Sequence, residues 1–138
     1  MSTTLLIKDE NLYGKFGDAD VFRLEIGAPR VTVRELIRTR VRVEVAEFNR
    51  MRAANLQHNV FRGLVQPADA EAALNGFRLR QPRMLDAQEQ IEKALVAFER
   101  NGFLLLVNDR QIESLDEQIE VTPATTVTFL KLVMLVGG

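Results

Sequence analysis

The chain opens with two stretches whose apolar positions fit β-strands. Residues 4–7 form a short apolar run, and residues 21–26 alternate, with Phe22, Leu24 and Ile26 on one side and charged residues on the other. This period of two is typical of a strand with one solvent-facing side. Residues 8–20, which hold two glycines and three aspartates, have the composition of a long turn-rich connection. We therefore predict a β-hairpin that ends at Gly27-Ala28-Pro29.

A long helix is predicted over residues 32–56. Thr32 and Glu35 have the spacing of a capping box, in which side-chain oxygens satisfy the first backbone donors of a helix. Apolar residues then recur three or four positions apart along one face: Val33, Ile37, Val41, Val45 and Phe48. The alternation of valines between Arg40 and Val45 favours a strand instead. We prefer the helix because the cap and the longer stripe agree and no turn interrupts them.

The next region, about 57–100, is predicted to be a mainly helical insertion. Pro67 is expected to begin a short helix through Leu74, and Asn75-Gly76 is expected to end it. Residues 77–82 fit a short extended piece that adds to a sheet or to another copy of the chain. A second helix is predicted to begin at Asp86, which precedes Glu89 by three positions.

The apolar face of that second helix consists of Ile91, Leu95 and Phe98. Asn101-Gly102 is a typical left-handed helix end. The chain then returns to strands. Residues 103–107 are a continuous apolar run, Asn108-Asp109 is a turn pair, and residues 110–112 can pair back.

Residues 114–119 predict a turn or a single helical turn. The final run, residues 126–136, is apolar on both faces, which is typical of a central strand. Lys131, inside this run, is expected to be a surface residue whose ammonium reaches solvent. The pattern leaves open which face of the strand is buried.

Composition excludes several classes of chemistry. The 138 residues include 18 basic and 19 acidic side chains, one histidine and no cysteine. A net charge of -1 gives no electrostatic basis for general nucleic-acid binding. Without cysteine there are no disulfides, thiolate metal sites or cysteine nucleophiles, and a single histidine is a poor basis for zinc or a serine triad. No apolar stretch is long enough for a membrane span and no signal-peptide pattern is present, so we expect a cytoplasmic protein.

The remaining charged groups do not predict catalysis. His58 is expected in a loop, and the acid pairs Asp69/Glu71 and Asp116/Glu117 have no partner for acid–base work. Four arginines cluster on the first predicted helix, where a solvated helix face is the expected explanation: Arg34, Arg38, Arg40 and Arg42. The sequence therefore predicts neither an enzyme nor a metal site.

The order of elements resembles the β-grasp fold of ubiquitin and of the sulfur carriers MoaD and ThiS. In that fold a hairpin, a helix across the sheet, a short hairpin-like segment and a last central strand lead into a tail with two glycines. The matching segments here are residues 4–26, 32–56, 103–112 and 126–138. Residues 107–112, followed by Leu115-Asp116 and Ile119, have the character of the corresponding ubiquitin segment.

The resemblance implies an α+β class: a β-grasp, ubiquitin-like mixed sheet with a long helix across it. It implies one domain over residues 1–138 with a free tail at about 134–138. The insertion at about 57–100, between the long helix and the third strand, is carried by neither ubiquitin nor MoaD. Ubiquitin-like proteins of bacteria that are encoded beside activating and conjugating enzymes are the expected setting.

The resemblance also implies the chemistry of the tail. Gly138 would supply a carboxylate that a ThiF/MoeB-like activating enzyme converts to an acyl adenylate with ATP, and Gly137 would let the backbone enter a narrow channel. Met134, Leu135 and Val136 would be an exposed apolar strip that docks in a groove of that enzyme. The partner would provide all catalytic groups, so the chain binds no cofactor of its own. A conjugating enzyme and a deconjugating peptidase are further expected partners.

Three functions remain open from sequence. The first is a protein modifier, conjugated through Gly138 to an amine of an unidentified target. The second is a sulfur carrier whose Gly138 becomes a thiocarboxylate. The third is a non-covalent β-grasp interaction domain, for which Gly137 and Gly138 have no chemical role.

Overall fold

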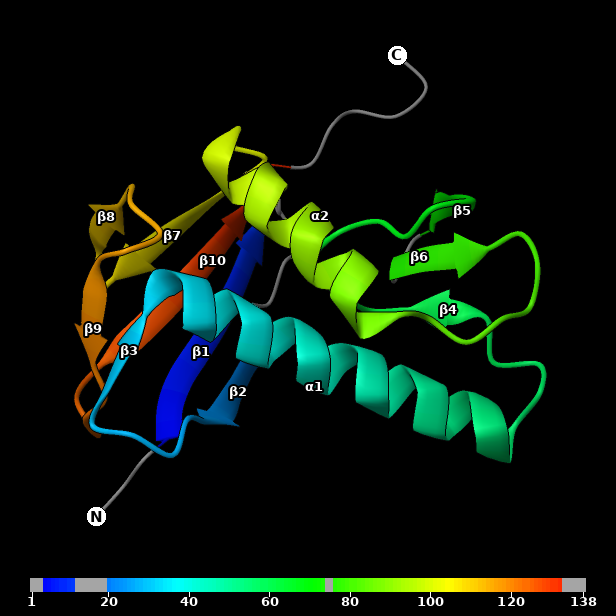
Figure 1. The fold of residues 1–138 in the computed structure, drawn as a ribbon, viewed down its shortest axis with the longest axis horizontal. Coiled ribbons are helices and arrows are strands. Elements are labelled where there is room, and N and C mark those ends of the chain that lie inside the picture. The colour runs from blue at the N-terminus through cyan, green and yellow to red at the C-terminus, as the bar shows by residue number, and fades with distance from the viewer. Residues whose placement is uncertain (1–3, 12–19, 74–75, 133–138) are drawn as a thin grey trace. The chain divides into compact units, whose positions relative to one another are not determined.

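The computed structural model of the chain describes residues 4–11, 20–73 and 76–132. These residues form an α+β structure (Figure 1). In chain order, its elements are β1 (Thr4–Asn11), β2 (Asp20–Glu25), β3 (Arg30–Thr32), α1 (Val33–Ala54), β4 (Val60–Phe61), β5 (Ala70–Ala73), β6 (Gly76–Leu79), α2 (Ala87–Glu99), β7 (Phe103–Val107), β8 (Arg110–Ile112), β9 (Gln118–Glu120) and β10 (Thr126–Lys131).

The chain divides into two compact units whose boundaries fall inside the two helices. We call Met1–Leu36 together with Ala97–Gly138 the sheet unit, and Ile37–Val96 the inserted unit. None of the helices in the described part of the chain is both long enough and apolar enough to cross a membrane.

The sheet unit is built on a mixed five-stranded sheet with the order β2-β1-β10-β7-β8 (Figure 1). The hairpin β1–β2 and the hairpin β7–β8 are antiparallel, as predicted. Between them lies β10, which runs parallel to β1 and antiparallel to β7. The prediction that the final run forms a central strand is therefore confirmed for Thr126–Lys131.

One face of this sheet, the inner face, carries the core of the sheet unit. Five side chains on the three middle strands have no exposed surface: Leu5, Ile7, Leu105, Val127 and Phe129. The rings of Phe103 and Phe129 lie 5.8 Å apart, and those of Phe98 and Phe103 lie 6.0 Å apart. Aromatic pairs at such distances add to the stability that burial alone provides.

A small second sheet joins the start of α1 to the segment after β8. Strand β3 pairs with β9, with Val31 opposite Ile119. The turn expected over residues 114–119 is present only at positions 115–116, because the segment continues as β9. The first backbone donors of a helix have no acceptor within the helix. Here Arg34 N donates to the carbonyl of Leu115, and Val33 N donates to the carbonyl of Glu117. Neither short strand has an alternating pattern long enough to be predicted.

The long helix is confirmed as α1. The Thr32 hydroxyl accepts a hydrogen bond from Glu35 N at 3.1 Å, as the cap predicted. All five residues of the predicted stripe are at most 4% exposed: Val33, Ile37, Val41, Val45 and Phe48. Val43 is 52% exposed, so the competing strand pattern did not determine the structure.

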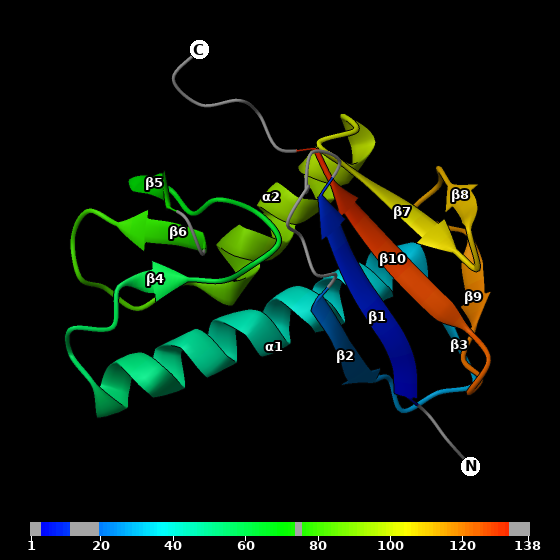
Figure 2. The ribbon, with the colours of Figure 1, turned by 180° about the vertical axis from the view of Figure 1, so that it is seen from behind.

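The inserted unit contains a three-stranded antiparallel sheet, β4-β6-β5, in addition to helix (Figure 2). The helix predicted from Pro67 to Leu74 is wrong, because Ala70–Ala73 is strand β5 and pairs with β6. Asp69 adopts φ 56°, which a right-handed helix does not allow, and Ala73 lies opposite Gly76. The prediction of a mainly helical insertion is wrong for the same reason. Leu74 and Asn75 lie outside the described residues.

The extended piece predicted at residues 77–82 is confirmed for Phe77–Leu79, which belong to β6, but its pairing with another copy of the chain is not supported. Strand β6 has β4 on one side and β5 on the other, so it offers no free edge to another copy of the chain.

The second helix is confirmed as α2. Asp86 Oδ2 accepts from Glu89 N at 3.2 Å, and Asn101 adopts φ 58° at the predicted end. Ile91 and Phe98 are buried, whereas Leu95 is half-buried.

Candidate functional site

The predicted site residues lie beyond the last described strand. Met134, Leu135, Val136, Gly137 and Gly138 are all outside the described residues. The structure does describe β10, which ends at Lys131 and precedes these residues in the chain. A candidate site is therefore built from β10 and the strands that flank it.

Neighbouring side chains of β10 point to opposite faces of the sheet, and the two faces differ in how deeply their side chains are buried. Val127 and Phe129 lie on the inner face and are fully buried. This resolves which face of the final strand is buried. Thr126, Thr128 and Leu130 alternate with them and therefore lie on the outer face.

The outer face carries a groove of about 300 Å³ across β1, β10 and β7, which lie side by side in Figure 2. Its apolar part is formed by Leu106 and Leu130, both half-buried. Thr126 and Thr128 line the middle, and Thr128 is 8% exposed. The polar rim consists of Lys8, Glu10, Asn108 and Asp109. A short apolar strip with a mixed-charge rim is suited to contact with a protein segment.

The β7–β8 turn fixes one end of the groove. Asn108 and Asp109 adopt φ 49° and 69°, a left-handed pair typical of a two-residue hairpin turn. Asn108 N donates to Thr126 O at 2.9 Å, and Asn108 Oδ1 accepts from Thr126 N at 2.9 Å. These two hydrogen bonds attach the turn to Thr126, the first residue of β10.

An ion pair lies at the other end of β10. Lys131 Nζ is 3.7 Å from Asp9 Oδ2, and the two side chains are 31% and 13% exposed. Lys131, which was predicted to be a surface residue, is partly exposed and also contacts this carboxylate on β1. This contact joins the end of the last described strand to its parallel neighbour.

The residues that line the groove do not form a catalytic combination. They include two hydroxyls and two carboxylates but no histidine, and in the described chain no group of three or more histidine, aspartate and glutamate side chains could hold a metal ion. His58 lies in the inserted unit, where its ring is 5.2 Å from that of Phe48.

The acid pairs noted in the sequence contact arginines. Asp116 pairs with Arg34 at 3.3 Å, and Glu117 pairs with Arg110 at 2.8 Å. Glu71 lies 3.9 Å from Arg78. These are partly or largely exposed ion pairs, which contribute little to stability individually.

The arginines of α1 do not form one solvated cluster, contrary to prediction. Arg40 is 2% exposed and pairs with Glu44 at 3.1 Å. Arg42 is exposed, whereas Arg34 pairs with Asp116. Because guanidinium groups of adjacent turns have different surroundings, this set of arginines is not a single binding surface.

Glu47 and Arg50, farther along α1, form an exposed pair at 2.7 Å. The hydrogen bond from Arg50 lowers the pKa of Glu47. This pair belongs to the helix surface of the inserted unit and has no connection to the groove of the sheet unit.

The sequence predicted a site in the tail, which lies outside the described residues, and did not predict the groove. The available signal was the continuous apolar run of β7, which places Leu106 on the face opposite the buried Leu105.

Comparisons with protein families, with curated proteins and with solved structures found no match to this chain.

Proposed function

We propose that this chain is a ubiquitin-like protein modifier with a β-grasp fold. The observation that carries the proposal is the place of β10. It lies in the centre of the sheet, parallel to β1, between the hairpins β1–β2 and β7–β8 (Figure 2). A last central strand that follows two hairpins and a helix is the arrangement that the resemblance to ubiquitin and to MoaD and ThiS implies.

The proposed reaction takes place at Gly138. Its carboxylate attacks the α-phosphate of ATP on a ThiF/MoeB-like activating enzyme, giving an acyl adenylate and releasing pyrophosphate. A thiol of the enzyme then displaces AMP and forms a thioester, and an amine of the target displaces the thiol and forms an amide. Gly137 and Gly138 have no Cβ, so the backbone approaches the nucleotide closely.

The groove supports a role for the sheet in this reaction. It is bordered by β10, the strand that precedes the proposed reactive segment. An activating enzyme that binds Leu106 and Leu130 while it receives Met134, Leu135 and Val136 would contact both the groove and the segment that follows β10 in the chain. Such a two-part contact positions Gly138 without any catalytic group from the modifier.

Intact-mass measurement tests the proposal. The full chain is incubated with an activating enzyme of the ThiF/MoeB class from the same organism, with and without ATP. We expect an ATP-dependent adenylate, enzyme thioester or target adduct that disappears when Gly137 and Gly138 are deleted. A chain that lacks Met1 and Ser2 keeps both tail residues and serves as a control for the removal of two terminal residues.

The outcomes separate the candidate functions. Absence of every ATP-dependent product contradicts the modifier. Exchange of one carboxylate oxygen for sulfur assigns the sulfur-carrier function instead. Binding of a partner that survives deletion of both glycines assigns a non-covalent interaction domain.

A further inference from the structure

The two units of the chain carry opposite net charge. The inserted unit, Ile37–Val96, has ten lysine and arginine residues and seven aspartate and glutamate residues. The rest of the chain has eight basic and twelve acidic residues. The overall charge of -1 is therefore the sum of a net charge of +3 on the inserted unit and -4 on the rest of the chain.

Much of the exposed basic charge of the insertion lies on one face of its small sheet. Arg78 on β6 lies opposite both Val60 on β4 and Glu71 on β5, so these three side chains share a face. The side chain of Arg78 is 61% exposed. The opposite face is the packed one, since Leu79 and its partner Ala70 are 3% and 7% exposed.

Two further arginines extend this face. Arg80 follows Arg78 by two positions and is exposed, and its backbone N donates to Asp69 O at 3.2 Å. Arg62 passes beside Gly76, where an added Cβ would lie only 3.3 Å from Arg62 Cγ. The same Cβ would lie 2.6 Å from the carbonyl oxygen of Phe61, so glycine at this position allows the segment Phe61-Arg62 to approach β6 closely. We name Arg62, Arg78 and Arg80 the arginine face.

The arginine face is only partly neutralised by its acidic neighbours. Glu71 is 51% exposed and lies 3.9 Å from Arg78, and Asp69 lies beside Arg80, whose backbone N donates to its carbonyl oxygen. Within the described ranges, the guanidinium groups of Arg62 and Arg80 have neither a hydrogen-bond partner nor an ion-pair partner.

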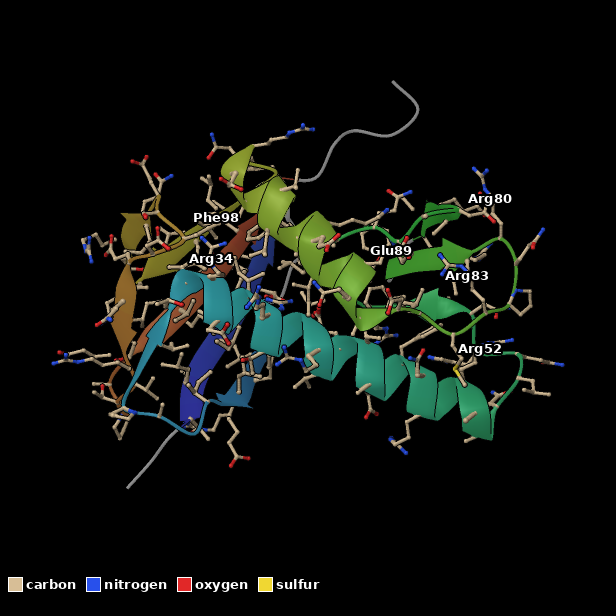
Figure 3. All side chains as sticks on the ribbon, in the orientation of Figure 1. Arg34, Arg52, Arg80, Arg83, Glu89 and Phe98 are labelled. Atoms are coloured by element: carbon tan, nitrogen blue, oxygen red, sulfur yellow. The ribbon has the colours of Figure 1, made fainter. Side chains whose placement is uncertain are left out.

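Other arginines of this unit have a clear structural role. Arg52 donates to Leu56 O at 2.6 Å and to Asn59 Oδ1 at 3.0 Å, and Arg83 donates to Ala68 O at 2.6 Å. Figure 3 shows Arg52, Arg80 and Arg83 around the small sheet. The guanidinium groups of Arg62 and Arg80, by contrast, make no such hydrogen bond within the described residues.

We propose that the arginine face is a docking surface for an acidic protein segment. Guanidinium groups bind carboxylates through two parallel hydrogen bonds and are more weakly hydrated than ammonium groups, which favours them at protein interfaces. Val60, half-buried beside Arg78, adds an apolar contact. A protein segment that carries both carboxylates and apolar side chains matches this combination of guanidinium groups and the apolar Val60. The surface does not depend on the reaction proposed at Gly138.

Fluorescence anisotropy with a labelled oligoglutamate peptide tests this surface on the full chain. We expect saturable binding at low salt that weakens as salt is added. The double variant R62E/R80E should weaken binding by about tenfold or more, since it replaces two attractions with repulsions. The control R30E/R100E makes the same charge change at exposed arginines of the sheet unit and should alter affinity by less than about twofold. Far-UV circular dichroism verifies that both variants fold.

Three outcomes overturn the proposal. The wild-type chain fails to bind the peptide at low salt, or the control weakens binding as much as R62E/R80E does. In the third outcome, single-stranded DNA of equal charge binds more tightly than the peptide and shows the same sensitivity to R62E/R80E, which assigns a nucleic-acid surface. Each result is independent of whether Gly138 is adenylated.

Discussion

Asn108 is expected to hold the start of β10 in place through two separable effects. Its side-chain oxygen accepts from Thr126 N at 2.9 Å, and its backbone adopts φ 49°. The substitution Asn108→Ala removes the hydrogen bond, which is worth about 1 kcal/mol. It also places a residue with an ordinary Cβ in the left-handed region, which costs about 1 kcal/mol more than asparagine there. We expect the free energy of unfolding to fall by about 2 kcal/mol.

The substitution Asn108→Gly separates these effects. Glycine adopts positive φ freely but lacks the hydrogen bond, so we expect a loss of about 1 kcal/mol. Asp109→Gly is the matched control. It lies at φ 69° in the same turn, and an Asn-Gly pair is the favoured sequence there, so stability should be kept or raised.

Urea unfolding followed by far-UV circular dichroism measures all three variants. With a slope of about 2 kcal/mol per molar urea, the midpoint should fall by about 1 M for Asn108→Ala and by about half as much for Asn108→Gly. Equal losses for alanine and glycine would refute the contribution of the backbone conformation. No loss for either variant would refute the role of the hydrogen bond to Thr126.

Three further predictions concern the core, the inserted unit and the groove. Phe129→Ala empties a fully buried site and should lower the free energy of unfolding by about 3–5 kcal/mol in urea titration, and a loss below about 1 kcal/mol contradicts the inner-face core. Glu44→Ala removes a carboxylate that pairs with buried Arg40 and accepts from Leu64 N at 3.2 Å, and should cost about 3 kcal/mol by the same measurement, more than the double replacement Arg40→Met/Glu44→Leu, which removes both charges. Leu130→Asp should raise the KM of the activating enzyme for this chain by about tenfold while kcat changes little, and an unchanged KM excludes the groove as its contact.

Local signals in the sequence were sufficient for most boundaries of the two helices and of the hairpins. The caps at Thr32 and Asp86 and the left-handed end at Asn101 act within one turn of chain, so their effect does not depend on distant residues. The same holds for the Asn108-Asp109 turn. Burial of the predicted α1 stripe followed from its spacing.

The inserted unit shows where local reasoning fails. Ala70–Ala73 has a composition that favours helix, yet it forms β5 because its backbone groups pair with β6. Strands β3 and β9, three residues each, also exist because of their partner across the chain. Arg40 is buried beside Glu44 and Arg42 is exposed, and no signal in the sequence distinguishes these two arginines.

Sequence alone was enough to predict both helices, the two hairpins and β10, together with the chemical groups that the chain contains: no cysteine, one histidine and a Gly137-Gly138 pair. Tertiary structure decided which face of β10 is buried, where a groove lies on the opposite face, and that exposed arginines of the insertion gather on one sheet face. The difference arises from the distance along the chain over which each interaction acts. Caps and turns are set by neighbouring residues, whereas strand pairing and burial depend on segments distant in the chain.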